Sequence, residues 1–111
     1  MIIHNETVDG VVVLSPSGRI DSNTAPQFES AVTEALAGTD RMILDFSNVT
    51  YVSSAGLRVV LIGAKQINAK KGGFALCGLS DNIMDVFELS GFTNILKILP
   101  DRDAAIQSMP E

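Results

Sequence analysis

The chain has 111 residues, 46% of them hydrophobic, and its eight basic and thirteen acidic residues give a net charge of −5. This composition supplies the core of one domain over residues 1–111 and excludes a disordered chain. The negative charge argues against nucleic acid and anionic membrane surfaces as partners, because both repel an acidic protein.

Cysteine and histidine each occur once, as Cys77 and His4. An intrachain disulfide is therefore impossible, and we expect no metal site and no other cofactor. Neither a basic-then-apolar leader nor an apolar run longer than four residues is present, so we expect a cytoplasmic protein without membrane insertion.

The first twenty residues predict a β-hairpin. Residues 1–8 and 11–14 are rich in β-forming side chains, and Asp9-Gly10 between them is typical of a two-residue type I′ turn. Pro16 cannot donate to a ladder, which predicts a strand end, a bulge or an edge. Residues 18–21 allow one more short extended piece.

Helices and strands alternate after the hairpin. We expect a first helix from Thr24 to a stop at Gly38, with Thr24 and Gln27 as a capping box or Asn23 as a competing cap. The further predicted elements are a strand at 41–46, a helix from Ser53-Ser54 to about Lys70, a strand at 74–77, a helix from Ser80 to Gly91, a strand at 95–98 and a helix at 101–108. This order predicts an α/β fold with a mixed, mostly parallel sheet, an N-terminal hairpin and about four covering helices.

The second predicted helix has more apolar residues than one buried stripe needs. The inner stripe comprises Leu57, Val60, Leu61, Ala64 and Ile67, whereas Val59 and Ile62 lie off it. Together with Met84 and Leu89 of the third helix, Val59 and Ile62 are candidates for a partner-binding face. The alternative is that they form the periphery of the core.

Signatures of catalysis are missing from the sequence. It contains no glycine-rich phosphate loop, and Ser53-Ser54 is not flanked as G-x-S-x-G, with His4 as the only available base. Asp45 near a strand end is placed like the phosphoacceptor of receiver domains, but the acidic pair that those domains need is absent. We therefore expect no enzyme; a small hydrolase acting through Ser54 is the remotest alternative.

The most unusual segment leads from a strand through a short loop into a helix that starts with two hydroxyls, Ser53 and Ser54. The simplest interpretation is that Ser54 is an N-cap whose Oγ accepts a first-turn amide. A helix N-terminus also carries partial positive charge, so a phosphate on Ser54 would be tolerated there.

Two motifs in the chain resemble those of STAS domains, specifically the bacterial anti-sigma factor antagonists. One is Gly18-Arg19-Ile20-Asp21 followed by Thr24-Ala25. The other is Asp45-x-Ser47-x-Val49-x-Tyr51-x-Ser53-Ser54-Ala55-Gly56-Leu57. The spacing of the motifs and the order of elements match this family over essentially the whole chain.

The resemblance implies a partner switch. Unphosphorylated antagonist binds an anti-sigma factor that is also a serine/threonine kinase and thereby releases the sigma factor; phosphorylation abolishes binding, and a serine phosphatase restores it. The phosphoserine of the family maps onto Ser54, with Ser53 as the alternative acceptor because it stands where many members have aspartate. The residues expected to bind the partner are Asp21, Ser53, Ser54, Gly56, Leu57, Arg58, Ile62 and Met84.

A second interpretation keeps the fold and changes the role. The chain would then be a STAS subunit of another complex, such as a lipid-transport or signalling assembly, in which Ser54 only caps its helix. Serine in place of aspartate at position 53 keeps this alternative open.

Overall fold

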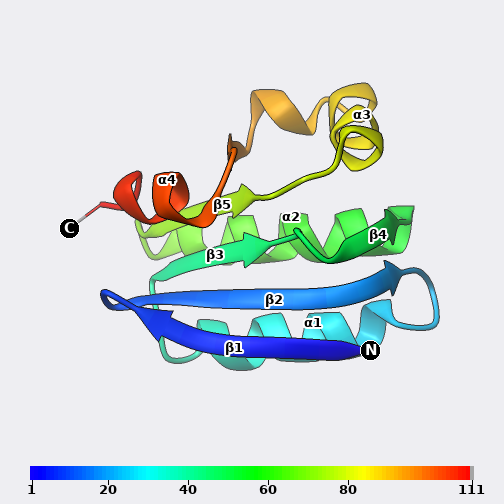
Figure 1. Ribbon diagram of the computed structural model, residues 1–111. Helices are drawn as coiled ribbons and strands as arrows, with labels where there is room; N and C mark the ends of the chain where they lie inside the picture. Colours follow the sequence, from blue (N-terminus) through cyan, green and yellow to red (C-terminus); the bar gives the residue numbers. More distant parts are fainter. Residues whose placement is uncertain (111) are drawn as a thin grey trace.

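A computed structural model describes residues 1–110, which form one six-stranded mixed sheet flanked by four α-helices and a short 3-10 helix (Figure 1). The elements are β1 (Ile2–Val8), β2 (Val11–Ile20), α1 (Ala25–Leu36), β3 (Arg41–Asp45), β4 (Val49–Val52), α2 (Ser54–Ala69), β5 (Gly73–Cys77), α3 (Asp81–Leu89), the 3-10 helix Phe92–Asn94, β6 (Lys97–Leu99) and α4 (Arg102–Gln107). The strand order is β1-β2-β3-β5-β6, and β4 also pairs with β2. This arrangement confirms the predicted fold class.

The predicted hairpin is present. Asp9 and Gly10 have φ angles of 52° and 77°, the positive values that a type I′ turn requires at both central positions. β1 and β2 pair antiparallel without interruption from Val8 opposite Val11 to Ile2 opposite Ser17.

Pro16 lies neither at a strand end, nor on an edge strand, nor at the bulge, contrary to all three predicted alternatives. It lies inside β2, opposite Ile3 of β1. On its other side β2 changes partner: residues 12–14 pair with β3, and residues 18–20 pair with β4. Because Pro16 falls in the gap between these two partners, its missing N–H leaves no ladder bond unmade.

β4 is a strand at a place where the sequence predicts a loop. It pairs in parallel with the end of β2, and the register shifts so that Gly18 lies opposite Val49 while Arg19 lies opposite Tyr51. Thr50 is thus an extra residue, and Val49 and Val52 are both buried although they are three positions apart. This bulge removes the two-residue alternation by which strands are recognised.

The sheet buries apolar side chains on both faces. α1 and α2 cover one face, as Figure 1 shows, where the rings of Phe28 and Phe46 lie 6.1 Å apart and those of Phe46 and Phe87 lie 6.3 Å apart. α4 covers the other face, over a smaller cluster that includes Ile43 and Cys77. Cys77 is fully buried, as expected for a strand thiol.

Three details of the later elements differ from prediction. The last strand occupies residues 97–99 rather than 95–98, because the amides of Ile95 and Leu96 donate back to the carbonyl of Phe92 in the 3-10 helix. Val59 belongs to the core with 2% exposure, so the alternative interpretation of this residue is confirmed and the partner-binding one is wrong. Leu61 of the predicted inner stripe is only half-buried. No helix among residues 1–110 is long and apolar enough to cross a membrane.

Candidate functional site

Two of the predicted site residues lie where β2 and β4 end side by side. The register brings Ile20 opposite Val52, and the amide of Ser53 donates to the carbonyl of Ile20 at 2.8 Å. Asp21 and Ser53 are the residues that follow this last pair. The parallel pairing therefore gathers the two sequence motifs, about thirty residues apart in the chain, at one edge of the sheet.

Ser53, not Ser54, is the N-cap of α2. Ser53 has extended backbone angles (φ −90°, ψ 174°), and its Oγ accepts from the Gly56 amide at 3.4 Å. Ser54 is the first helical residue and is exposed; among residues 1–110 no side-chain hydrogen bond involves it. The prediction of a capping role for Ser54 is thus wrong, and its hydroxyl is the one that remains available.

Asp21 shapes the turn between β2 and α1. Its Oδ1 accepts from the amides of Asn23 (3.0 Å) and Thr24 (3.2 Å), and its carbonyl accepts from the amides of Thr24 and Ala25. Hydrogen bonds from these Asn23 and Thr24 amides hold the pKa of Asp21 below its ordinary value. The carboxylate is therefore charged at neutral pH beside the start of α2.

The capping box expected at α1 does not form. Thr24 occupies the N-cap position, but its hydroxyl accepts from the amide of Asp21 and donates to the carbonyl of Arg19. Gln27 instead donates to the carbonyl of Met1 at 2.8 Å. The Asp21 carboxylate accepts the amide of the N-cap residue Thr24, the one bond of the box that is replaced.

Gly56 and Leu57 face the sheet rather than solvent. A Cβ on Gly56 would lie 2.7 Å from Cγ2 of Ile20 and 3.3 Å from Cγ1 of Val52, so only glycine allows α2 to start this close to both strands. Leu57 is 8% exposed. Both were predicted as partner contacts, but this placement makes them supports of the helix start, with little surface to offer.

The remaining predicted partner residues spread away from the two serines. Arg58 is exposed one turn into α2, and Ile62 is half-buried one turn further along. Met84 is half-buried in the first turn of α3, which lies at the same end of the molecule as β4 (Figure 1). Leu89, near the end of α3, is 89% exposed.

Arg19 and Tyr51 form a part of this edge that the sequence analysis missed. The Arg19 guanidinium lies 4.1 Å from the centre of the Tyr51 ring, and its Nε is 3.7 Å from Asp21 Oδ2. Tyr51 is 41% exposed. The β-forming run Val49–Val52 could have indicated a strand that brings Tyr51 beside Arg19.

Asp45 has a structural role that excludes the role of a free phosphoacceptor. One carboxylate oxygen accepts from the amide and the hydroxyl of Ser47, and the other accepts from Nε and Nη2 of Arg102 at 3.2 and 2.9 Å. Burial raises the pKa of Asp45, but the hydrogen bonds from Ser47 and Arg102 outweigh it and lower the pKa below its ordinary value. Burial, with Asp45 nearby, raises the pKa of the Cys77 thiol to about 12.

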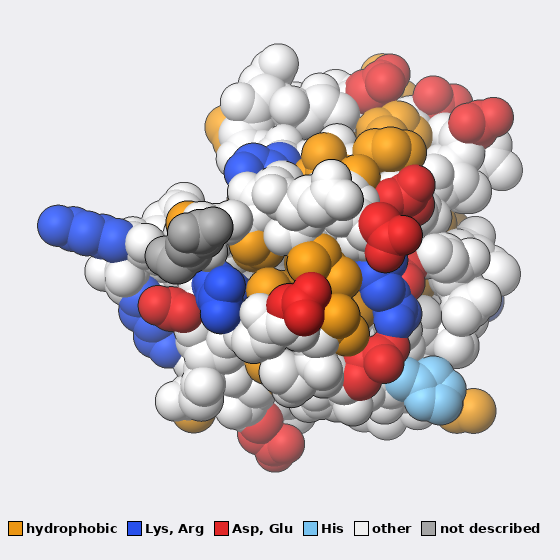
Figure 2. Space-filling model, turned by 60° about the vertical axis from the view of Figure 1, so that its left-hand side comes forward, with side chains coloured by type: hydrophobic (Ala, Val, Ile, Leu, Met, Phe, Trp, Pro, Cys, Tyr) orange, Lys and Arg blue, Asp and Glu red, His pale blue; other side chains and the backbone are white. Residues whose placement is uncertain are grey.

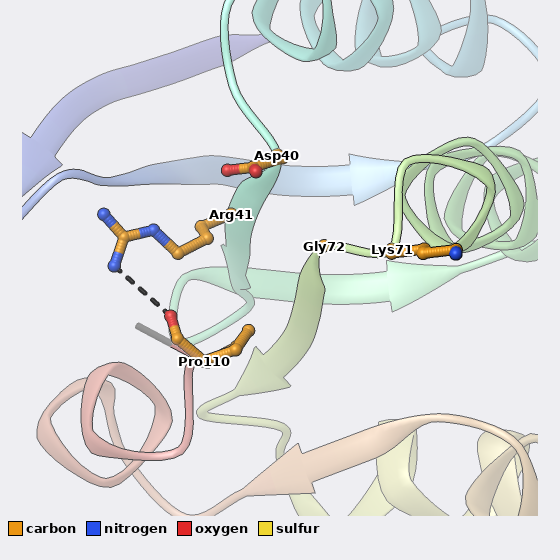
Figure 3. Close-up of a pocket in the computed structure, with 5 residues that line it drawn as sticks. All are labelled: Asp40, Arg41, Lys71, Gly72 and Pro110. Carbon is orange, nitrogen blue, oxygen red and sulfur yellow. Dashed lines mark hydrogen bonds between the residues drawn. The ribbon is translucent and has the colours of Figure 1, made fainter.

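A polar hollow of about 270 Å³ lies at the opposite end of the strands (Figure 3). Its lining includes Arg41 at the start of β3 and Gly72 just before β5, whereas Ser53 follows the end of β4. Arg41 points across it to the carbonyl of Pro110, 3.4 Å from Nη1. The hollow is therefore separate from the candidate site.

Among residues 1–110, no three His, Cys, Asp or Glu side chains gather where they could hold a metal ion.

Comparisons with known proteins agree on one family. The STAS domain matches residues 3–105. BtrV of Bordetella bronchiseptica, assigned as an anti-sigma factor antagonist, is 38% identical over 101 residues, covering 90% of this chain and 87% of BtrV. The anti-sigma-B factor antagonist of Listeria monocytogenes is 32% identical, covering 74% of this chain and 73% of its own. The crystal structure of an anti-sigma factor antagonist from Mycobacterium paratuberculosis superposes with a TM-score of 0.91 at 26% identity, covering 99% and 94% of the two chains.

Proposed function

The chain belongs to the STAS domain family, and from this premise we propose that it is an anti-sigma factor antagonist controlled by phosphorylation of Ser54. In its unphosphorylated form it binds an anti-sigma factor that is also a serine/threonine kinase, and the sigma factor is released. Phosphorylation of Ser54 ends this binding, and a serine phosphatase restores it. The chain acts by binding alone and performs no catalysis.

The difference between the two neighbouring serines carries the proposal. The Ser53 hydroxyl is engaged by the Gly56 amide, whereas the Ser54 hydroxyl is exposed and engaged by nothing in residues 1–110. A kinase can therefore reach Ser54 without breaking the cap of α2. The first turn of a helix also tolerates the dianion, because its free amides carry partial positive charge.

Magnitudes decide how the phosphate acts. The interaction of the phosphate with the helix dipole is worth roughly 0.3–1 kcal/mol. This free energy is too small to rearrange a folded domain that is stable by several kcal/mol. Turning a partner from almost fully bound to almost fully free takes roughly 5.5 kcal/mol. Burying about −1.5 to −2 charges against a partner without a counter-ion can supply that difference. Phosphorylation thus blocks the interface and leaves the fold unchanged.

The proposed contact surface surrounds Ser54. Asp21 and Ser53 lie beside it at the ends of β2 and β4, and Arg58 is exposed one turn into α2. Ile62 and Met84 offer partly exposed apolar area further out. Gly56 and Leu57 contribute by holding the helix start against Ile20 and Val52 rather than by touching the partner.

Phosphopeptide mass spectrometry on the protein from its native cells, grown under several conditions, tests the proposal directly. Trypsin releases residues 42–58, which also contain Ser47, Thr50, Tyr51 and Ser53, so fragment ions must locate the phosphate. We expect a condition-dependent phosphate on Ser54. No phosphate under any condition, with the phosphatase inhibited, would instead favour the constitutive STAS subunit of another complex.

Two alanine variants separate the hydroxyls. Ser53→Ala removes the cap and should lower the free energy of unfolding by about 0.5–2 kcal/mol while phosphorylation persists. Ser54→Ala should change it by less than about 0.5 kcal/mol, abolish phosphorylation and keep the kinase bound in pull-downs. Ser54→Asp should weaken that binding. The opposite pattern, with phosphate lost only in Ser53→Ala, would move the acceptor to Ser53.

A further inference from the structure

β1 is an edge strand whose outer side pairs with nothing in residues 1–110. The strand order places β1 at one end of the sheet, and all seven of its residues pair with β2 on the inner side only. Five of these seven residues are exposed. β1 contains no lysine, proline or bulge, three devices that prevent an edge from pairing with another chain, and its one acidic residue, Glu6, is paired with Arg102.

The register of the hairpin fixes which backbone groups point outward. Val8 and Val11 flank the two-residue turn and form a hydrogen-bonded pair, and such pairs then alternate along the ladder. The inward-bonding residues of β1 are therefore the even-numbered ones. The outward N–H and C=O groups belong to Ile3, Asn5 and Thr7.

These groups are arranged symmetrically about Asn5, and we propose that β1 pairs antiparallel with β1 of a second copy of this chain, with Asn5 on the twofold axis. In that register Asn5 meets Asn5 of the second copy, and Ile3 meets Thr7 in both directions. Each of these pairs can exchange two backbone hydrogen bonds. The two sheets then join into one continuous sheet.

Side chains of the even-numbered residues select the same register. It places His4 opposite Glu6 of the second copy, twice, and Ile2 opposite Val8. Glu6 is already held in position by the guanidinium of Arg102. Figure 2 shows the single histidine of the chain standing at the surface beside an exposed hydrophobic side chain, and Ile2 is 65% exposed. A register centred on Glu6 would instead set two glutamates directly opposite each other.

Cysteine cross-linking tests both the pairing and its register. Asn5→Cys should form a disulfide-linked dimer under mild oxidation, because Cα atoms in a hydrogen-bonded pair lie about 5.5 Å apart, within reach of a disulfide. The matched variant Thr7→Cys should stay monomeric on denaturing gels, because its two copies would lie about 14 Å apart. The native thiol, Cys77, is buried and should not react.

Sedimentation measurements test the same interface without cysteine. We expect a weak, reversible dimer of the unmodified chain, because one strand pair buries less than a standard interface. Asn5→Lys brings two like charges together on the axis and should raise the dissociation constant of the dimer up to about fivefold. The control Asn68→Lys makes the same change at an exposed position of α2 and should leave the dissociation constant unchanged. Because residue 4 lies opposite Glu6 of the second copy, His4→Lys should lower the dissociation constant and His4→Glu should raise it, each by roughly two- to tenfold.

Two results would overturn the proposal. One is a monomer at every concentration together with no disulfide in Asn5→Cys. The other is equal cross-linking of Asn5→Cys and Thr7→Cys, which would indicate random collision. Circular dichroism of each variant checks that the fold is retained, so that loss of pairing is not mistaken for unfolding.

Discussion

Asp21 and Asp45 each stand at the end of a strand of the central sheet, and each carboxylate accepts the amide of the residue two positions on, at 3.0 Å. Each also meets an arginine. Arg19 lies 3.7 Å from Asp21 with a side chain that is 62% exposed, whereas Arg102 binds the nearly buried Asp45 at 2.9 Å. The local motif is the same, but the surroundings differ.

The difference shows how one turn motif serves two purposes. Asp45 joins three distant pieces of the chain, because Arg102 of α4 also reaches Glu6 of β1 and Ser15 of β2. Asp21 organises only its own turn and keeps its charge at the surface beside Ser53. Removing Asp45 should therefore weaken the whole fold, and removing Asp21 should act mainly on the site.

The largest effect should come from Asp45→Ala. The change leaves the Ser47 amide and hydroxyl without their acceptor, and it leaves Arg102 with only Glu6 and Ser15. We expect a loss of about 2–4 kcal/mol in the free energy of unfolding, less than for a fully buried pair because Arg102 still meets water. Urea unfolding measures it, with exposed Asp85→Ala as the matched control, expected to change stability by less than about 0.5 kcal/mol. Equal losses in both would refute the structural role of Asp45.

Arg102→Met should cost somewhat less, about 1–3 kcal/mol, because the methionine keeps the apolar stem over the sheet while Asp45 keeps Ser47. Combining the two variants gives a double-mutant cycle. We expect a coupling energy between Asp45 and Arg102 of about 0.5–3 kcal/mol. Strict additivity would mean that the Asp45–Arg102 pair contributes no coupling energy to stability.

Lowering the pH should reduce the stability contributed by both carboxylates, Asp21 and Asp45. Both pKa values lie below the ordinary 3.8, so their contribution to stability is complete above about pH 4 and is lost as the pH falls through the lowered values. Asp45→Asn should flatten the acid limb of a stability-against-pH curve. Added salt should reduce the contribution of the exposed Asp21 carboxylate to stability more than the contribution of Asp45. An unchanged acid limb in Asp45→Asn would contradict the assignment.

The smallest stability effect should come from Asp21→Asn. The asparagine oxygen can still accept the Asn23 and Thr24 amides, so the turn survives while the charge is lost. We expect thermal unfolding close to that of the unmodified chain. Kinase binding in pull-downs should change instead, since Asp21 lies in the proposed contact surface. A stability loss as large as that of Asp45→Ala would show that the two aspartates are equivalent.

Local patterns predicted the elements that local forces determine. The hairpin followed from Asp9-Gly10, and α3 from its cap, Ser80, and its stop, Gly91, because each signal lies within a few residues of the structure it specifies. β4 was not predicted, because the bulge at Thr50 places Val49 and Val52 on the same side of the strand. The prediction for Pro16 was wrong because a proline is tolerated there only through the distant positions at which β3 ends and β4 begins.

The candidate site was found from its motifs, but its details needed the fold. Which serine caps α2 depends on where β4 ends, since the cap must leave the strand with an extended backbone. Asp45 and Arg102 are 57 positions apart in the chain, and the residues next to each of them give no sign of the hydrogen bond between them. The proximity of Arg19 and Tyr51 likewise depends on the pairing of β2 with β4.

β2 also determines where the chain can change its length. β3 and β4 follow each other along the same side of this one strand, so residues 46–48 must cover a fixed distance between two fixed registers. A single inserted residue there would turn β4 over, bringing Tyr51 inward and Val52 outward, and would displace both serines. Insertions at the exposed Asp9-Gly10 or Ala37-Gly38 should be tolerated better, because neither pair lies between two strands that share one partner. Insertion scanning should therefore find residues 45–54 the least tolerant stretch of the first half of the chain.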